Sequence, residues 1–224
     1  MKVCTDACLF GAWVAVESLK LKAQSCLDIG TGTGLLSLIF EQKNITANID
    51  AVEIDEAAAQ QAGENFESSP WKERLHIYNE SIQQFGNSKT RQLKYDVIIC
   101  NPPFYENDLK SENKQRNLAL HSDAFTLEEL ISVVDLLLAD DGSFFVLLPF
   151  HRAKYFEELL TKNKLFIREK VFIKQTPKHN FFRIMFWVPR LATTSTQSEI
   201  IIMNDENQYS NEFKKLLKDY YLSL

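Results

Sequence analysis

The segment Asn101-Pro102-Pro103-Phe104 could hold a planar ring that bears an exocyclic amino group. It follows the apolar run 95–100, and proline ends such a run because it has no amide hydrogen to donate to a neighbouring strand. The side-chain carbonyl of Asn101 and the carbonyl of a prolyl amide are acceptors that could converge on one NH2 group. The ring of Phe104 could stack on the plane that carries the amine. We therefore predict that Asn101, Pro102, Pro103 and Phe104 form a catalytic segment.

A glycine-rich segment, DIGTGTG at residues 28–34, lies between a predicted strand and a predicted helix. A doubly wound sheet binds nucleotide-like cofactors at this position, because glycine permits a tight turn and a close approach of the backbone to the ligand. A dinucleotide fingerprint would have its third glycine at position 35, where this chain has Leu35. No Gly-Lys-Ser/Thr follows, so the segment does not match a phosphate-binding P-loop.

The spacing Asp-x-Gly-x-Gly-x-Gly resembles motif I of the S-adenosylmethionine-dependent methyltransferases. Their cofactor carries an ammonium and a sulfonium group that a nearby acid would favour electrostatically, and we assign this role to Asp28. Glu53 ends the predicted second strand, 23 positions after Gly30, where a carboxylate can accept hydrogen bonds from both hydroxyls of a ribose. The resemblance implies S-adenosylmethionine as the cofactor, with predicted contacts from Asp28, Gly30, Thr31, Gly32, Gly34, Glu53 and Ile54.

The contact to the adenine amino group of the cofactor is less defined. Methyltransferases of this kind usually have an acid after the third strand, and here the chain reads NESIQQF. The alignment places Ser81 at the position of the acid, with Glu80 just before it. The contact to the adenine amino group stays open between Ser81, Glu80 and backbone groups near Ile82. Asn101 is also predicted to contact the cofactor.

The resemblance also gives residues 101–104 a chemical role. An amine conjugated to a ring is a poor nucleophile, and acceptors that draw its hydrogens out of the plane localise the lone pair for in-line attack on a methyl group. This chemistry needs no catalytic serine, no catalytic cysteine and no metal. Enzymes that methylate N6 of adenine, N4 of cytosine or the glutamine amide all carry Asn/Asp-Pro-Pro-Tyr/Phe, so the motif does not separate these substrates.

Strands and helices alternate along the chain. Apolar runs predict strands, and amphipathic or alanine-rich stretches predict helices. Asp55 is predicted to cap the third helix, and Thr126 and Glu129 have the spacing of a capping box. The strands are expected at 25–30, 45–55, 74–80, 95–100, 143–149, 165–175 and 181–189, and the helices at 6–19, 35–43, 56–69, from 126, at 151–163 and at 210–224. This order predicts an α/β, doubly wound, mostly parallel seven-stranded Rossmann-like sheet with one antiparallel strand near the C-terminus, in a single domain over residues 1–224.

Three stretches carry a more specific resemblance: MKVCTDACLFGAW, AVEIDEAAAQQAGENFESSPW and NDENQYSNEFKKLLKDYYL. They are similar to the bacterial tRNA (adenine-N6)-methyltransferases that modify adenosine 37, which follows the anticodon, in a valine tRNA. The resemblance implies methyl transfer from S-adenosylmethionine to N6 of that adenosine. The family usually has a strand-rich lead before the KV stretch, which we expect to be missing here, and a glycine where this chain has Cys4.

Other substrates remain open on the motifs alone. They are an adenine N6 or a guanine N2 in another nucleic acid, and the side-chain amide of a protein glutamine. Glutamine methyltransferases usually carry a helical N-terminal domain, and DNA or ribosomal RNA methyltransferases usually carry target-recognition domains. We expect neither here. A module that holds RNA without methylating it would not need Asn101 and Phe104.

The formal charge of −5 does not suggest a general nucleic-acid coat, but the charge is uneven. Residues 151–190 contain ten basic and three acidic side chains, a pattern that fits either a phosphate-binding surface or a solvated face. For a tRNA substrate the predicted phosphate contacts are Lys174 and Lys178 in this segment, and Lys110, Lys114 and Arg116 in the polar stretch 105–122.

The N-terminus and the hydropathy of the chain predict a cytoplasmic protein. We expect a monomer. The N-terminus does not resemble a signal peptide, and no window is apolar over the length of a membrane span. The four cysteines lack the paired spacing of a zinc site, and we expect free buried thiols and no bound metal.

Overall fold

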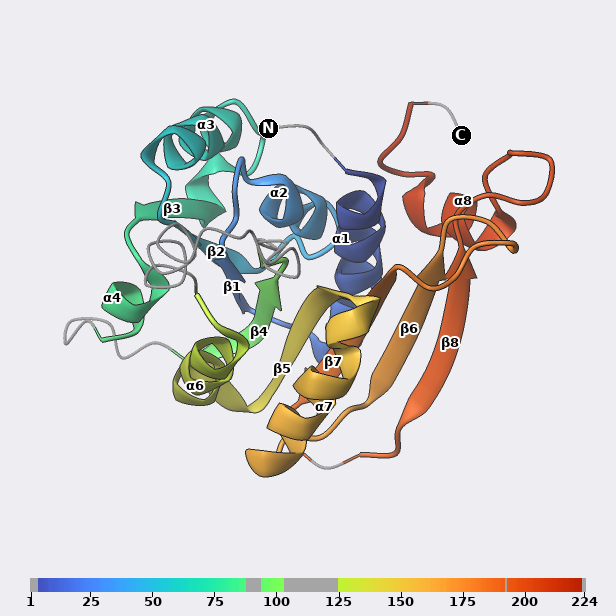
Figure 1. The fold of residues 1–224 in the computed structure, drawn as a ribbon. Helices are drawn as coiled ribbons and strands as arrows, with labels where there is room; N and C mark the ends of the chain where they lie inside the picture. Colours follow the sequence, from blue (N-terminus) through green and yellow to red (C-terminus); the bar gives the residue numbers. More distant parts are fainter. Residues whose placement is uncertain (1–3, 88–93, 103–124, 192, 223–224) are drawn as a thin grey trace, which may run out of the picture.

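The computed structural model describes residues 4–87, 94–102, 125–191 and 193–222. Within them, eight strands form one sheet in the order β3-β2-β1-β4-β5-β7-β6-β8 (Figure 1). The strands are β1 (Ser25–Ile29), β2 (Asn48–Glu53), β3 (Leu75–Asn79), β4 (Tyr95–Cys100), β5 (Leu138–Pro149), β6 (Glu169–Lys174), β7 (Arg183–Pro189) and β8 (Thr196–Ile201).

The sheet is parallel except at one strand. β1 to β5 pair in parallel, β7 is antiparallel to both β5 and β6, and β8 is parallel to β6. The predicted mostly parallel sheet with one antiparallel strand is therefore confirmed, but the predicted count of seven strands is wrong. The eighth strand, β8, has four exposed residues in succession. It lies at the sheet edge, where a strand pairs on one side only, and it lacks the apolar pattern by which strands are predicted.

Helices cover both faces of the sheet. The first face packs against α1 (Thr5–Ser18), α2 (Leu35–Glu41), α3 (Glu56–Glu67) and α8 (Asn211–Leu217). The second face packs against α4 (Ile82–Gly86), α6 (Leu127–Leu137) and α7 (Ala153–Lys162). Strand side chains alternate between the two cores, because successive residues of a strand point to opposite faces: Val97 and Ile99 lie in the first, Ile98 and Cys100 in the second.

Both predicted helix caps are present. The Asp55 carboxylate accepts a hydrogen bond from the Ala58 amide at 2.8 Å, and Thr126 and Glu129 form the capping box at the start of α6. β5 begins at Leu138 and not at the predicted residue 143, so Asp140, Asp141 and Gly142, whose types favour a turn, lie within the strand. The pairing of β5 with β4 shifts in register there, from Leu138 to Ser143, and this irregularity accommodates the turn residues inside the strand.

The cysteines match the expectation only in part. Cys8, Cys26 and Cys100 are buried, whereas Cys4 is exposed because it precedes the first turn of α1. Within the described ranges, no helix is both long and apolar enough to cross a bilayer. The same ranges contain no cluster of three or more side chains suited to hold a metal ion.

Candidate active site

The strand order brings the predicted site segments to one edge of the sheet. β1 lies between β2 and β4, and Ile29 pairs with Val52 on one side and Cys100 on the other. The glycine segment, Glu53 and Asn101 each follow or end one of these strands, so all three lie at the carboxyl edge, where doubly wound sheets bind ligands. Segments about 70 residues apart in the chain are thereby adjacent in space.

The glycine segment has a backbone that other residues rarely adopt. Gly30, Gly32 and Gly34 have φ angles of +68°, +60° and +85°, in the region where a Cβ is disfavoured. A Cβ added to Gly30 would meet no atom of the described residues within 4 Å, so among these residues its backbone faces open space that a ligand can enter. A Cβ added to Gly34 would lie 2.5 Å from a ring carbon of Phe66. Gly30 therefore permits ligand approach, and Gly34 permits close packing of the loop on α3.

Asp28 anchors this loop from inside the sheet. Its Oδ2 accepts hydrogen bonds from the hydroxyls of Thr31 and Ser37, both at 2.7 Å. Its Oδ1 is buried and has no partner among the described residues. Burial raises the pKa of Asp28 to about 6, against the opposing effect of the two hydroxyl groups. Asp28 therefore has a structural role that the sequence did not reveal, and its electrostatic role toward the cofactor stays a prediction.

Glu53 links the loop to the next helix. Its Oε2 accepts from the Gly32 amide at 2.8 Å, and its Oε1 accepts from the Asp55 amide at 2.9 Å. The half-buried carboxylate is therefore held in a fixed orientation before any ligand binds. Each carboxylate oxygen can accept a further hydrogen bond, which is what contact with a ribose diol requires.

The residues that follow β2 and β3 lie at the same carboxyl edge of the sheet as the glycine segment. Ile54 is 72% exposed and Ile82 is buried. Ser81 caps α4 through a capping box with Gln84. Sequence reasoning missed Asn79, whose side-chain amide donates to the carbonyl of Glu53 at 2.9 Å and to that of Ile54 at 3.3 Å. Asn79 thereby ties the end of β3 to the turn after β2.

The predicted catalytic segment begins where β4 ends. Asn101 is half-buried and Pro102 is buried. Pro103 and Phe104 lie outside the described residues, as do Lys110, Lys114 and Arg116.

Five of the ten basic side chains in the stretch 151–190 form ion pairs, four of them with acids from elsewhere in the chain. Of the two predicted phosphate contacts, Lys174 Nζ lies 3.2 Å from a carboxylate oxygen of Glu199, and Lys178 Nζ lies 3.4 Å from one of Asp205. Other pairs in this stretch are Lys170 with Glu157, Arg183 with Asp6 and Arg190 with Asp135. The stretch is therefore not a continuous basic face.

The site fits S-adenosylmethionine on three observations. The buried Oδ1 of Asp28 lacks a partner in the described part of the chain, the Gly30 backbone faces open space, and the Glu53 carboxylate is fixed beside it. These are an acid for the cationic end, a backbone that a ligand can approach, and acceptors for a ribose.

This fold and site define a Rossmann-like methyltransferase that uses S-adenosylmethionine as the methyl donor. A family model described as "Methyltransferase small domain" matches residues 4–162. The fold is similar to the crystal structure of a predicted O-methyltransferase from Agrobacterium tumefaciens, with a TM-score of 0.71, 14% identity and 95% of each chain covered. At that identity the likeness concerns the fold alone.

Two curated relatives show which family of methyltransferases the chain belongs to. A tRNA1(Val) (adenine(37)-N6)-methyltransferase from Flavobacterium psychrophilum is 38% identical over all of this chain and 94% of its own length. The protein of that name from Pseudoalteromonas translucida is also 38% identical, over all of this chain and 93% of its own. The chain belongs to the family of tRNA1(Val) (adenine(37)-N6)-methyltransferases, as the resemblance in its sequence predicts.

Proposed function

We propose that this protein transfers a methyl group from S-adenosylmethionine to N6 of adenosine 37 in a valine tRNA, in the cytoplasm. The observation that carries the proposal is the position of Asn101 and Pro102 at the end of β4, beside the glycine segment that follows β1. Adjacent strands bring the acceptors for an amine next to the place where a methyl donor fits. The relatives of that name, 38% identical along the whole chain, support the choice of substrate.

Each residue has a distinct task in this proposal. Bound S-adenosylmethionine supplies an electrophilic methyl group on its sulfonium. Asp28 holds the glycine segment in place and favours the cationic end of the ligand, and Glu53 accepts from the ribose hydroxyls. The carbonyl oxygens of Asn101 and of the prolyl segment accept the hydrogens of the exocyclic amine and fix its orientation. We also assign Phe104, with Pro103, to stacking the target base.

The first test is transfer of labelled methyl groups to total tRNA from a strain that lacks this modification. A glutamine-bearing release factor serves as the parallel substrate, and nucleoside analysis identifies the product. We expect N6-methyladenosine in a valine tRNA. Label in the release factor, or in neither substrate, would reject the proposed substrate and leave the cofactor site intact.

The second test addresses Asn101. In Asn101→Ala the contacts of Asp28 and Glu53 with the glycine segment are kept, so S-adenosylmethionine binding by calorimetry should stay close to the wild-type value even though Asn101 lies on the cofactor side. Turnover should fall by about 100-fold or more, because a preorganised acceptor for the amine is lost. Asn48→Ala is a matched control, since Asn48 is exposed at the start of β2, at the opposite edge of the sheet. Turnover near the wild-type rate in Asn101→Ala would refute the role of Asn101.

A further inference from the structure

Three phenylalanine rings pack against one another at the carboxyl edge of the sheet, and we call them the aromatic platform (Phe150, Phe172 and Phe181). The ring centroids of Phe150 lie 6.0 Å from Phe172 and 5.4 Å from Phe181. Those of Phe172 and Phe181 lie 5.1 Å apart. Each ring therefore contacts the other two.

The platform is only partly covered by the rest of the protein. Phe150 is 38% exposed, and Phe172 and Phe181 are half-buried. Phe172 packs against the second core, whereas Phe150 and Phe181 belong to neither core cluster. Burial of aromatic surface is a main source of stability, so rings held together but left partly in water offer a surface to a ligand.

The order of the strands brings the three rings together. Phe150 follows β5, Phe172 lies in β6 and Phe181 precedes β7. The ladder pairs Pro149 with Arg183, and Arg183 with Ile173. Two backbone hydrogen bonds fix the crossing: the Phe150 amide donates to the Phe182 carbonyl, and the Phe182 amide donates to the Ile173 carbonyl, both at 3.1 Å.

The platform continues the edge that carries Asn101. β5 is next to β4, and β6 is three strand spacings from β4, or about 14 Å. The register places the end of β4 beside residues 146 onward of β5, so Phe150 lies only a few residues beyond Asn101 along the neighbouring strand. A substrate seated at Asn101 and extending across the sheet edge would reach the platform.

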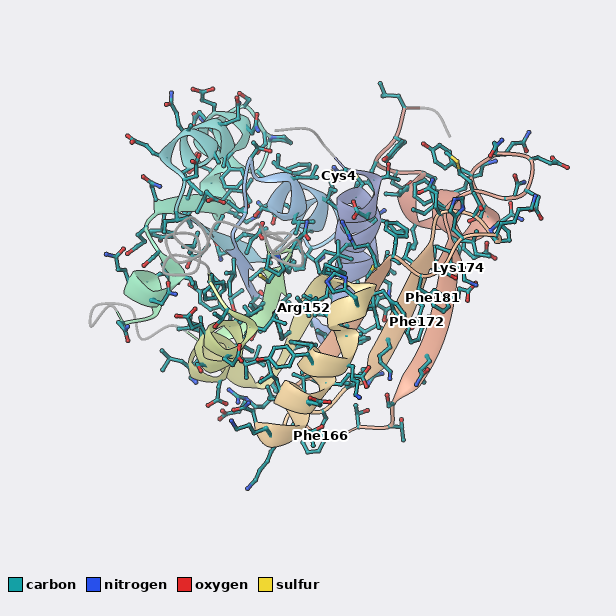
Figure 2. All side chains as sticks on the ribbon, viewed as in Figure 1. Cys4, Arg152, Phe166, Phe172, Lys174 and Phe181 are labelled. Carbon is teal, nitrogen blue, oxygen red and sulfur yellow. The ribbon has the colours of Figure 1, made fainter. Side chains whose placement is uncertain are left out.

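Two basic side chains, Lys174 and Arg152, belong to the same edge of the sheet as the rings. Lys174 Nζ lies 4.5 Å above the centroid of the Phe181 ring, and the carboxylate of Glu199 holds it there at 3.2 Å. His151 and Arg152 follow Phe150 and are exposed at the start of α7. Figure 2 shows Phe172, Phe181 and Lys174 together near the end of β6, with Arg152 at the near end of α7.

Aromatic faces beside cationic side chains are the combination that binds unpaired nucleotides, because every base has a face that can stack and every nucleotide has a phosphate. We propose that the aromatic platform, with Lys174, holds an unpaired base of the substrate RNA next to the adenosine that is methylated. This inference rests on the proposed function and extends it from the reacting base to a second nucleotide of the same loop.

Leucine substitutions test the aromatic platform without leaving a cavity in it. The double variant Phe150→Leu, Phe181→Leu keeps the apolar volume but removes two stacking faces. Its affinity for valine tRNA, measured by filter binding, should fall about tenfold or more. Affinity for S-adenosylmethionine and the melting temperature should stay close to the wild type. The double variant with tyrosine at both positions keeps the rings and should restore tRNA affinity.

Phe166→Leu is the matched control. Phe166 is 41% exposed but lies between α7 and β6, at the opposite end of the molecule in Figure 2. Its substitution should leave tRNA affinity unchanged. Lys174→Gln should weaken tRNA binding and lower the slope of log affinity against log salt by about one.

A modified RNA identifies the ligand as a base. Anticodon-loop positions other than the target are replaced one at a time by an abasic residue. For an abasic residue at one of these positions, the wild-type protein should bind the RNA about tenfold more weakly than it binds the unmodified RNA. The double leucine variant should bind the abasic and the unmodified RNA with equal affinity. Unchanged tRNA affinity in the double leucine variant, with an active wild type, would reject the platform and leave the proposed function standing. A wild type that neither binds nor methylates tRNA would reject both.

Discussion

The buried acid Asp28 should destabilise the protein at neutral pH, and its replacement by asparagine should reveal this. Burial raises its pKa from the ordinary 3.8 to about 6. A rise of this size corresponds to about 3 kcal/mol of unfavourable free energy for the ionised form in the folded state. Asparagine has nearly the same shape, carries no charge and can exchange hydrogen bonds with the hydroxyls of Thr31 and Ser37.

The free energy of unfolding depends on pH because Asp28 has a different pKa in the folded and in the unfolded state. Between about pH 4 and pH 6 the unfolded chain has an ionised Asp28, whereas the folded protein keeps the proton, so stability falls as the pH rises through this window. Below the window the carboxyl is neutral in both states, and wild type and Asp28→Asn should be nearly equal. Above it, the variant should be more stable by up to about 3 kcal/mol.

Urea unfolding of both proteins from pH 4.5 to pH 7.5 measures this difference. Asp140→Asn, at an exposed site in β5, is the control for loss of one carboxylate. Calorimetry should show that Asp28→Asn binds S-adenosylmethionine about tenfold more weakly, because the neutral amide no longer favours a cationic ligand. A difference in unfolding free energy that stays flat with pH, or a variant less stable at pH 7.5, would refute this account of Asp28.

Two further predictions concern the same loop. Glu53→Gln replaces one acceptor oxygen with an amide nitrogen that faces a backbone N–H. Calorimetry should therefore show that S-adenosylmethionine binds about tenfold to 100-fold more weakly. The control Glu56→Gln, at an exposed site in the first turn of α3, should bind S-adenosylmethionine with the wild-type affinity. Gly34→Ala brings a Cβ within 2.5 Å of Phe66 at a φ of +85°, and urea unfolding should show a loss of about 2–4 kcal/mol. Gly63→Ala, with its nearest neighbour at 3.5 Å inside α3, should be neutral or stabilising by up to about 1 kcal/mol; equal stability of the two alanine variants would contradict the packing argument.

Residue types and their order along the chain are enough to predict the elements that carry the site. Glycine at positions 30, 32 and 34 is required by positive φ angles, and such local constraints can be read from residue type. The order of strands and helices predicts a doubly wound sheet, whose carboxyl edge must then bring Glu53 and Asn101 near the glycine segment. The helix caps at Asp55 and Thr126 are likewise local, since each acts within three residues.

The tertiary structure decided what depends on residues far apart in the chain. The sequence shows ten basic side chains in the stretch 151–190, but only the structure shows that four of them pair with Asp6, Asp135, Glu199 and Asp205. The strand β8 has no apolar pattern and forms because β6 offers it a free edge.

The site depends on the same long-range effects. Asp28 could be chosen as an acid near a cofactor loop, but its raised pKa results from complete burial, which only packing can set. The aromatic platform joins residues 150, 172 and 181, whose spacing follows no helical or strand period. They meet because β7 inserts between β5 and β6. Local sequence specifies turns, caps and faces, whereas the choice among partners across the sheet is made by the whole fold.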